Sequence, residues 1–110
     1  MIEQKQVEAA LEYMQTHAQD LANAKANRIY ITHYLKSCLA MLYQKSTGKT
    51  DKARESDAHA DPEYLKQLAA LQIAVQEEER HRWKMNAAEA MVEVWRTQEA
   101  NNRAIDRGHQ

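Results

Sequence analysis

The sequence predicts an all-α fold, an antiparallel hairpin of two long helices (about residues 3–47 and 62–107) joined by a short helical connector. Only two glycines and one proline occur in 110 residues, and Gly48 and Pro62 lie close together near the middle. Ala, Glu, Lys, Leu and Arg make up close to half of the chain, a composition typical of long helices and coiled coils. Apolar residues recur at intervals of three and four on both sides of this midpoint.

The first long stretch carries a heptad repeat that neither Gly nor Pro interrupts. A 3.5-residue repeat keeps one face of a helix turned toward a partner helix. The same phase places Lys25, Arg28 and Thr32 in the middle, so this face is apolar at both ends and polar between them. Its predicted apolar positions are Val7, Leu11, Met14, Ala18, Leu21, Leu35, Leu39 and Leu42.

The segment between the two stretches starts at Gly48, where we expect the first helix to end. Thr50 is placed to cap a helix of two turns, because a threonine hydroxyl accepts from the free backbone N–H groups of a first turn. A loop over residues 49–60 is the alternative. No breaker lies between Thr50 and Asp61, and this favours the short helix.

The second long helix has a well-defined predicted start. Asp61 is a suitable N-cap, Pro62 suits the first helical position, and Glu63 suits the positive end of the helix dipole. We expect Gly108 to stop the helix just after Arg107. The predicted apolar face comprises Tyr64, Leu68, Leu71 and Val75, then, out of phase after the polar run 76–82, Ala88, Met91, Trp95 and Ile105. Trp95 should therefore be more buried than Trp83.

Folding the two helices back on each other brings their polar interruptions together. Arg28 then lies near His81, within about one turn. Buried charges are costly unless they are paired, so we expect a polar layer of Arg28, Glu77, Glu78 and His81 in which Arg28 pairs with Glu77 or Glu78. The alternative is that the helices open here to water or a ligand.

A two-helix hairpin buries too little apolar surface to be comfortably stable alone. The sequence also has more aromatic and Met side chains than one hairpin interface covers. We therefore expect residues 1–110 to form a single helical domain that assembles into a homodimer, as a four-helix bundle, or into a higher homo-oligomer.

Charge and motif content narrow the functional classes. A net charge of −1 argues against a strongly basic nucleic-acid-binding arm. Arg96, Arg103 and Arg107 form one basic stripe, with Tyr13 expected opposite, and are the candidates for nucleic-acid or partner contact. The predicted nucleic-acid contact stays open, because acidic residues interleave with the stripe.

We expect no catalytic residues, cofactor or metal. Glu78 and His81 have the Glu-x-x-His spacing of di-iron bundles, but the facing position holds the cation Arg28. No two histidines lie three or four residues apart. No apolar run approaches a membrane span, and the single Cys38 cannot form an internal disulfide, so the expected location is cytoplasmic. Cys38 itself is expected to be a buried small hydrophobe.

The second half of the chain resembles small helical proteins of tailed bacteriophages and prophages, encoded in the early, recombination-associated region. The resemblance covers residues 57–107. It is carried by Asp61-Pro62-Glu63-Tyr64, Leu68, Glu77-Glu78-Glu79, Arg82-Trp83, Ala87-Ala88 and the run from Val94-Trp95-Arg96 to Arg103. It brings no catalytic residues with it.

The resemblance implies a bacterial-host context and a non-enzymatic accessory role in phage DNA recombination or replication. Because the chain is close to neutral, we expect it to act by protein–protein contact on a host or phage DNA-processing factor. The alternatives are a direct single-stranded nucleic-acid binder and a purely structural coiled-coil oligomerisation module.

Overall fold

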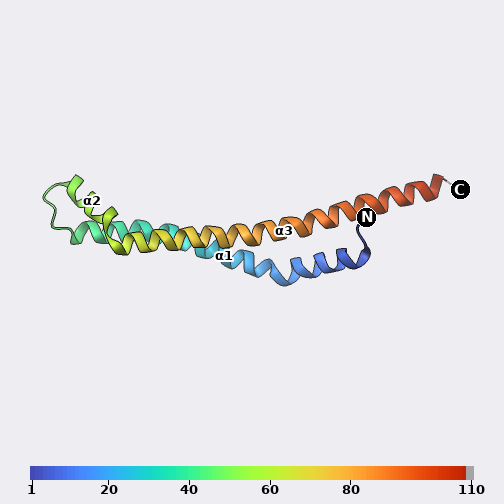
Figure 1. Cartoon of the computed structure of the whole chain (residues 1–110), viewed down its shortest axis with the longest axis horizontal. Coiled ribbons are helices and arrows are strands. Elements are labelled where there is room, and N and C mark those ends of the chain that lie inside the picture. The colour runs from blue at the N-terminus through green and yellow to red at the C-terminus, as the bar shows by residue number, and fades with distance from the viewer. Residues whose placement is uncertain (109–110) are drawn as a thin grey trace. The chain divides into compact units, whose positions relative to one another are not determined.

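The computed structural model describes residues 1–108, and these form three helices with no strand among them. The helices are α1 (Gln4–Lys45), α2 (Asp51–Ala60) and α3 (Pro62–Gly108) (Figure 1). The predicted all-α class and the two long helices are confirmed, with bounds within two residues of those expected. The connector is a helix and not a loop. Gly108 is still helical, and no glycine in the described part of the chain has a positive φ, so the predicted glycine stop is wrong.

The caps at the connector follow from residue chemistry. The Thr50 side chain accepts a hydrogen bond from the Ala53 backbone N–H at 3.1 Å, as an N-cap does. Asp61 ends α2 and caps α3, because its carboxylate accepts from the Glu63 backbone N–H at 2.8 Å. Pro62 opens α3 at the position where its missing N–H costs nothing.

The inward face of α1 keeps Val7, Met14, Leu21, Leu35 and Leu42 of the predicted face, but the positions between them shift by one residue. Leu11 is exposed while Ala10 is buried, and Cys38 is buried more completely than Leu39. Small side chains at such positions let two helices approach each other closely. The series that contains every fully buried residue of α1 is Val7, Ala10, Met14, His17, Leu21, Ala24, Arg28, Ile31, Leu35, Cys38 and Leu42.

The inward face of α3 keeps one phase from end to end. Leu68 and Val75 are exposed, and Ala74 is buried in their place. The predicted loss of phase after residue 76 is therefore wrong, because Glu78 and His81 occupy inward positions of an unbroken repeat. That repeat is Tyr64, Gln67, Leu71, Ala74, Glu78, His81, Met85, Ala88, Val92, Trp95 and Glu99. Ile105, the last predicted apolar position, is exposed.

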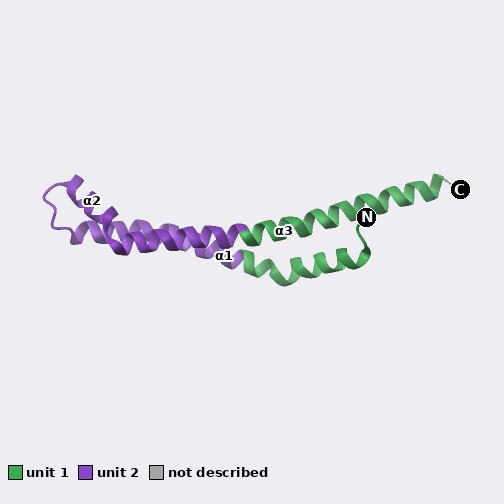
Figure 2. Cartoon of the chain, viewed as in Figure 1, with its two compact units in different colours: residues 1–21, 80–110 green, residues 22–79 purple. Residues whose placement is uncertain are grey.

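The chain divides into two compact units, and both long helices contribute to each (Figure 2). Unit 1 comprises residues 1–21 and 80–110, and unit 2 comprises residues 22–79. The expectation that residues 1–110 form a single helical domain stays a prediction.

Unit 1 has a small core made by the start of α1 and the second half of α3. Its buried members are Val7, Ala10, Ala88 and Val92. The partly buried side chains packed against them are Ile2, Tyr13, Met14, Met91 and Trp95. The Ile2 backbone N–H donates to the Gln98 side-chain oxygen at 3.2 Å. The predicted register that sets Arg28 opposite His81 would set Ile2 opposite Arg107, so this register is wrong in unit 1.

Unit 2 contains the rest of α1, the whole of α2 and the start of α3. Its buried hydrophobic residues are Leu35, Cys38, Ala58 and Ala74, so α2 adds Ala58 to this core. The His59 and Tyr64 rings meet edge to face at 5.4 Å across the junction of α2 and α3. The burial predicted for Cys38 is confirmed.

Candidate functional site

The most buried charge in the described residues lies inside unit 2. Glu78 is an inward position of α3, and only 3% of its side chain is exposed. The Arg28 guanidinium, from α1, forms an ion pair with this carboxylate through Nε, and its Nη2 donates to the second oxygen at 3.3 Å. Both carboxylate oxygens are thus engaged by one planar group, the arrangement that best offsets the desolvation of a buried carboxylate.

The electrostatics of this pair follow from the contact. The hydrogen bond to Glu78 raises the pKa of the Arg28 guanidinium, and partial burial opposes that shift without reversing it. The Arg28 carbonyl accepts from the Thr32 hydroxyl at 2.8 Å, so a second predicted polar residue is satisfied within its own helix. The Arg28 guanidinium therefore stays charged near neutral pH.

Of the predicted polar layer, the structure shows the ion pair between Arg28 and Glu78. Of the two acids that the sequence allowed as partners of Arg28, the structure pairs it with Glu78. Glu77 is partly buried beside it on α3, whereas Lys25 is exposed. His81 is a partly buried inward residue that belongs to unit 1.

A second polar cluster in unit 2 joins α2 and the loop before it to the end of α1. The Tyr43 hydroxyl hydrogen bonds to Asp51, and this bond raises the pKa of the Tyr43 phenol. Arg54 donates from Nε to the Gly48 carbonyl at 3.0 Å and lies 5.7 Å from the centre of the Tyr43 ring. Ser46 donates to Asp57 at 2.6 Å. These contacts tie the loop to both flanking helices, which is a structural role.

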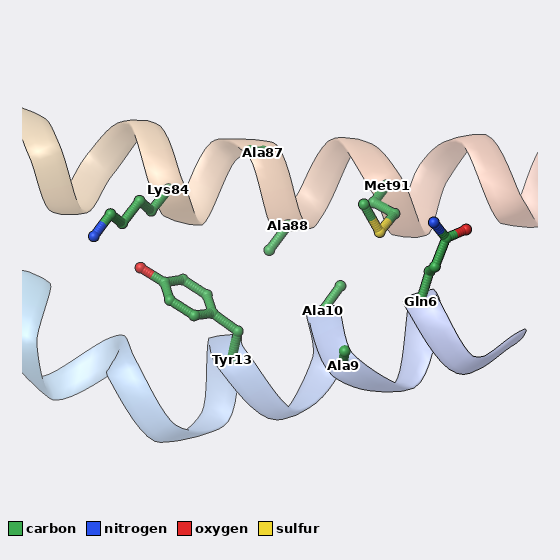
Figure 3. A pocket seen from close by; sticks show the side chains of 8 residues that line it. All are labelled: Gln6, Ala9, Ala10, Tyr13, Lys84, Ala87, Ala88 and Met91. Carbon is green, nitrogen blue, oxygen red and sulfur yellow. The ribbon is translucent and has the colours of Figure 1, made fainter. Parts of the chain in front are cut away.

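Unit 1 carries a shallow apolar groove between its two helices (Figure 3). Its volume is about 430 Å³. Tyr13 and Lys84 lie at one end, and Gln6 lies near Met91 at the other (Figure 3). Four alanines form the rest of the lining: Ala9, Ala10, Ala87 and Ala88.

This groove was not predicted, although the sequence contains a pattern of small residues that indicates it. Ala9-Ala10 and Ala87-Ala88 are adjacent alanine pairs, one on each helix. In each pair the second alanine is an inward position, and the first lies beside it on the outer side. Such pairs on both helices remove side-chain volume from one flank of the interface and leave a groove there.

Unit 2 has an exposed apolar stripe on α3. Leu65, Leu68, Gln72 and Val75 are spaced three and four residues apart, and Leu68 is 43% exposed. A surface hollow of about 380 Å³ runs along this stripe. On α1, the other long helix of unit 2, the aromatic rings of Tyr30 and Tyr34 stack with their centres 6.3 Å apart. Tyr30 is exposed.

The arginines of the predicted basic stripe lie on exposed α3 surface in unit 1. Arg96 donates to Glu93 at 3.1 Å. Arg103 lines one hollow with Trp95 and Glu99, and another with Asp106 and Arg107. The surface is therefore of mixed charge.

The aromatic side chain expected opposite Arg96 lies elsewhere. Tyr13 lines the groove of unit 1 and stacks on His17 with ring centres 4.5 Å apart. The predicted placement of Tyr13 against the basic stripe is wrong, because unit 1 does not use the register that the sequence suggested.

Within residues 1–108, no cluster of three or more His, Cys, Asp or Glu side chains has the arrangement of a metal site. None of the helices in the same range has a stretch that is both long and apolar enough to span a bilayer.

Comparison of the chain with protein-family models, with curated proteins and with solved structures found no match.

Proposed function

We propose that this chain is a non-catalytic helical protein that acts by protein–protein contact and assembles with itself, as a dimeric four-helix bundle or a higher homo-oligomer. The observation that carries the proposal is the amount of surface left uncovered. The chain exposes 8324 Å². A compact monomer of 12.7 kDa is expected to expose only about 6,200 Å².

The composition of that surface supports the same function. Half of the buried hydrophobic residues are alanine, and the others are two valines, one leucine and one cysteine. The larger apolar side chains lie outside: Leu11, Ile29, Tyr30, Met41, Leu65, Leu68, Ile73, Val75, Trp83, Val94 and Ile105. Exposed apolar faces of this extent on a soluble helical pair mark interaction sites.

The resemblance of residues 57–107 to phage and prophage proteins supports a context for this contact. We place the chain in the cytoplasm of a bacterial host, as an accessory protein in phage DNA recombination or replication that binds a DNA-processing factor. The unit 2 stripe is the surface proposed for that factor, because three of its four members are apolar and none is charged. In a pull-down from a bacterial host, the Leu68→Glu variant should no longer capture the factor that the wild-type chain captures. Capture of the same factor by both proteins would contradict this assignment.

Light scattering tests self-assembly directly. The purified chain at micromolar concentration should show at least twice the chain mass of 12.7 kDa. A fully helical monomer over the whole micromolar range would overturn the proposal.

The hollow beside Trp95, lined by Arg96 and Arg103, is the one feature that favours a second function, binding of single-stranded nucleic acid. Gel-shift assays at two salt concentrations test it, because phosphate contacts weaken steeply with salt. Salt-sensitive binding that Arg103→Ala reduces would support this function. Absence of binding at low salt would exclude it.

A further inference from the structure

The groove of unit 1 has an exposed indole beside it. Trp83 is 68% exposed and lies one turn before Ala87 on α3. Side chains four residues apart lie on the same face of a helix. Trp83 therefore projects from the face that also carries the alanine lining of the groove. A large exposed aromatic residue and a shallow apolar groove thus occur together on one surface.

We propose that a second copy of this chain docks on this surface, and that the Trp83 side chain of each copy enters the groove of the other. The inference rests on the self-assembly proposed above and identifies its interface. Because the protruding residue and the groove belong to one surface, the contact is isologous and closes as a two-fold dimer.

A two-fold axis at Ala87 gives this contact a simple geometry. When two copies of α3 cross antiparallel at that position, residues equally far from Ala87 on either side face each other. Trp83 and Met91 are each four residues from Ala87. Trp83 of one copy then meets Met91 of the other, a groove residue whose sulfur makes favourable contacts with aromatic rings.

The side chains along this face suit a close crossing. Ala87 at the crossing point allows the helix axes to approach, because interaxial distance depends on the size of the side chains at the contact. Ala90 and the exposed Val94 continue the same face. The polar groups Gln6, Tyr13 and Lys84 lie toward the ends of the groove, where water still reaches them (Figure 3).

The occupant is a second copy because the uncovered area is of the size that such an assembly buries. Two copies together expose about 4,000 Å² more than two compact monomers of this mass. Obligate homodimer interfaces bury about 2,000 Å² or more in total. Tryptophan is also the residue type most enriched among those that dominate binding energy at interfaces.

Mass measurements on the full chain test the interface. Trp83→Ala should weaken dimerisation by roughly 30-fold or more, the effect of losing a dominant interface residue. Ala87→Arg, which places a charged side chain at the crossing, should give a monomer. Tyr30→Ala is the matched control, because it removes an equally exposed aromatic ring from unit 2 and should leave the dimer intact. Far-UV spectra of all variants should retain the wild-type helix content.

Acrylamide quenching gives a second readout that does not depend on how a groove variant folds. In Trp95→Phe, Trp83 is the single tryptophan, and its quenching should fall several-fold as the concentration rises from nanomolar to micromolar. In Trp83→Phe, the quenching of Trp95 should not change with concentration, because Trp95 packs within the core of unit 1.

The outcomes separate the interface from self-assembly. A wild-type dimer that Trp83→Ala leaves unchanged, or whose Trp83 stays equally quenched when the mass doubles, overturns this interface and leaves self-assembly standing. A wild-type monomer overturns both. Loss of the dimer in Trp83→Ala, together with protection of Trp83 that rises with concentration in Trp95→Phe, supports the interface.

Discussion

Arg28 on α1 and Glu78 on α3 form the one ion pair of the described residues in which a carboxylate is almost completely buried. The pair is asymmetric, because 32% of the Arg28 side chain is exposed against 3% of Glu78. The guanidinium thus brings its charge from the surface to a carboxylate held at an inward position. Removing the arginine would leave that carboxylate buried without its counter-charge.

Arg28→Ala should therefore lower the melting temperature clearly, by roughly 10 °C, because Glu78 then needs water or a proton in a poorly solvated site. Lys25→Ala, an exposed lysine of the same helix turn, is the control and should change the melting temperature little. Arg28→Met combined with Glu78→Leu should restore most of the loss. Equal melting temperatures for Arg28→Ala and Lys25→Ala would show that water already solvates the pair.

The buried thiol predicts an alkaline weakening of the fold. Burial raises the pKa of the Cys38 thiol above its ordinary value of 9.0, and Glu63 and Asp61 add to the shift. The folded state then holds the proton when the unfolded state has lost it, so this contribution is complete below pH 9 and is lost as the pH rises toward the folded-state pKa.

Denaturant melts of the wild type and of Cys38→Ala, at pH 7.5 and pH 10, measure this effect. The wild type should lose stability relative to Cys38→Ala at the higher pH. Tyr43 titrates in both proteins, so its contribution cancels in the difference. A constant difference between the two proteins would mean that the Cys38 thiol ionises as freely in the fold as outside it.

The cap of α2 should be worth a measurable amount. Thr50→Ala removes the acceptor of the Ala53 N–H and should cost about 1 kcal/mol of unfolding free energy. Thr47→Ala, an exposed threonine three residues earlier, should cost much less. Equal losses at the two positions would argue against the cap.

Gly48 should resist even a small substitution. A Cβ at this position would lie 3.0 Å from the Ala53 Cβ and 3.1 Å from the Arg54 backbone nitrogen. Gly48→Ala should therefore destabilise the protein in chemical unfolding, because backbone must shift to admit the methyl group. Gly108→Ala is the control, since a Cβ there meets nothing within 4 Å. A neutral Gly48→Ala variant would show that the connector adjusts freely.

The phase of the helix interface can be tested by exchanging large and small residues. Ala88→Leu should cost about 1–3 kcal/mol, because it forces a larger side chain into the core of unit 1. Leu11→Ala, at an exposed position that the sequence pattern had placed inward, should cost clearly less than the 2–5 kcal/mol of a buried leucine. If Leu11→Ala cost more unfolding free energy than Ala88→Leu, the phase predicted from the sequence, with Leu11 inward, would be the correct one.

The amino-acid sequence by itself determined the helices, their bounds to within two residues and the caps of α2 and α3, because these depend on local chemistry. Long stretches without Gly or Pro allow a helix to continue. The Thr50 hydroxyl and the Asp61-Pro62 pair start helices, and each acts within one or two turns of its own position. The same information selected Glu77 and Glu78 as partners for Arg28, since a buried cation requires a nearby acid.

Only the tertiary structure decided which side of each helix faces inward. Hydrophobicity favoured Leu11 and Leu68, but packing between closely spaced helices selected Ala10 and Ala74, because small side chains fit where leucines do not. Glu78 and His81 concealed the continuous repeat of α3 because polar residues occupy inward positions there. The groove of unit 1 could not be predicted from either helix alone, because it is formed by side-chain volume that is missing from both helices at once.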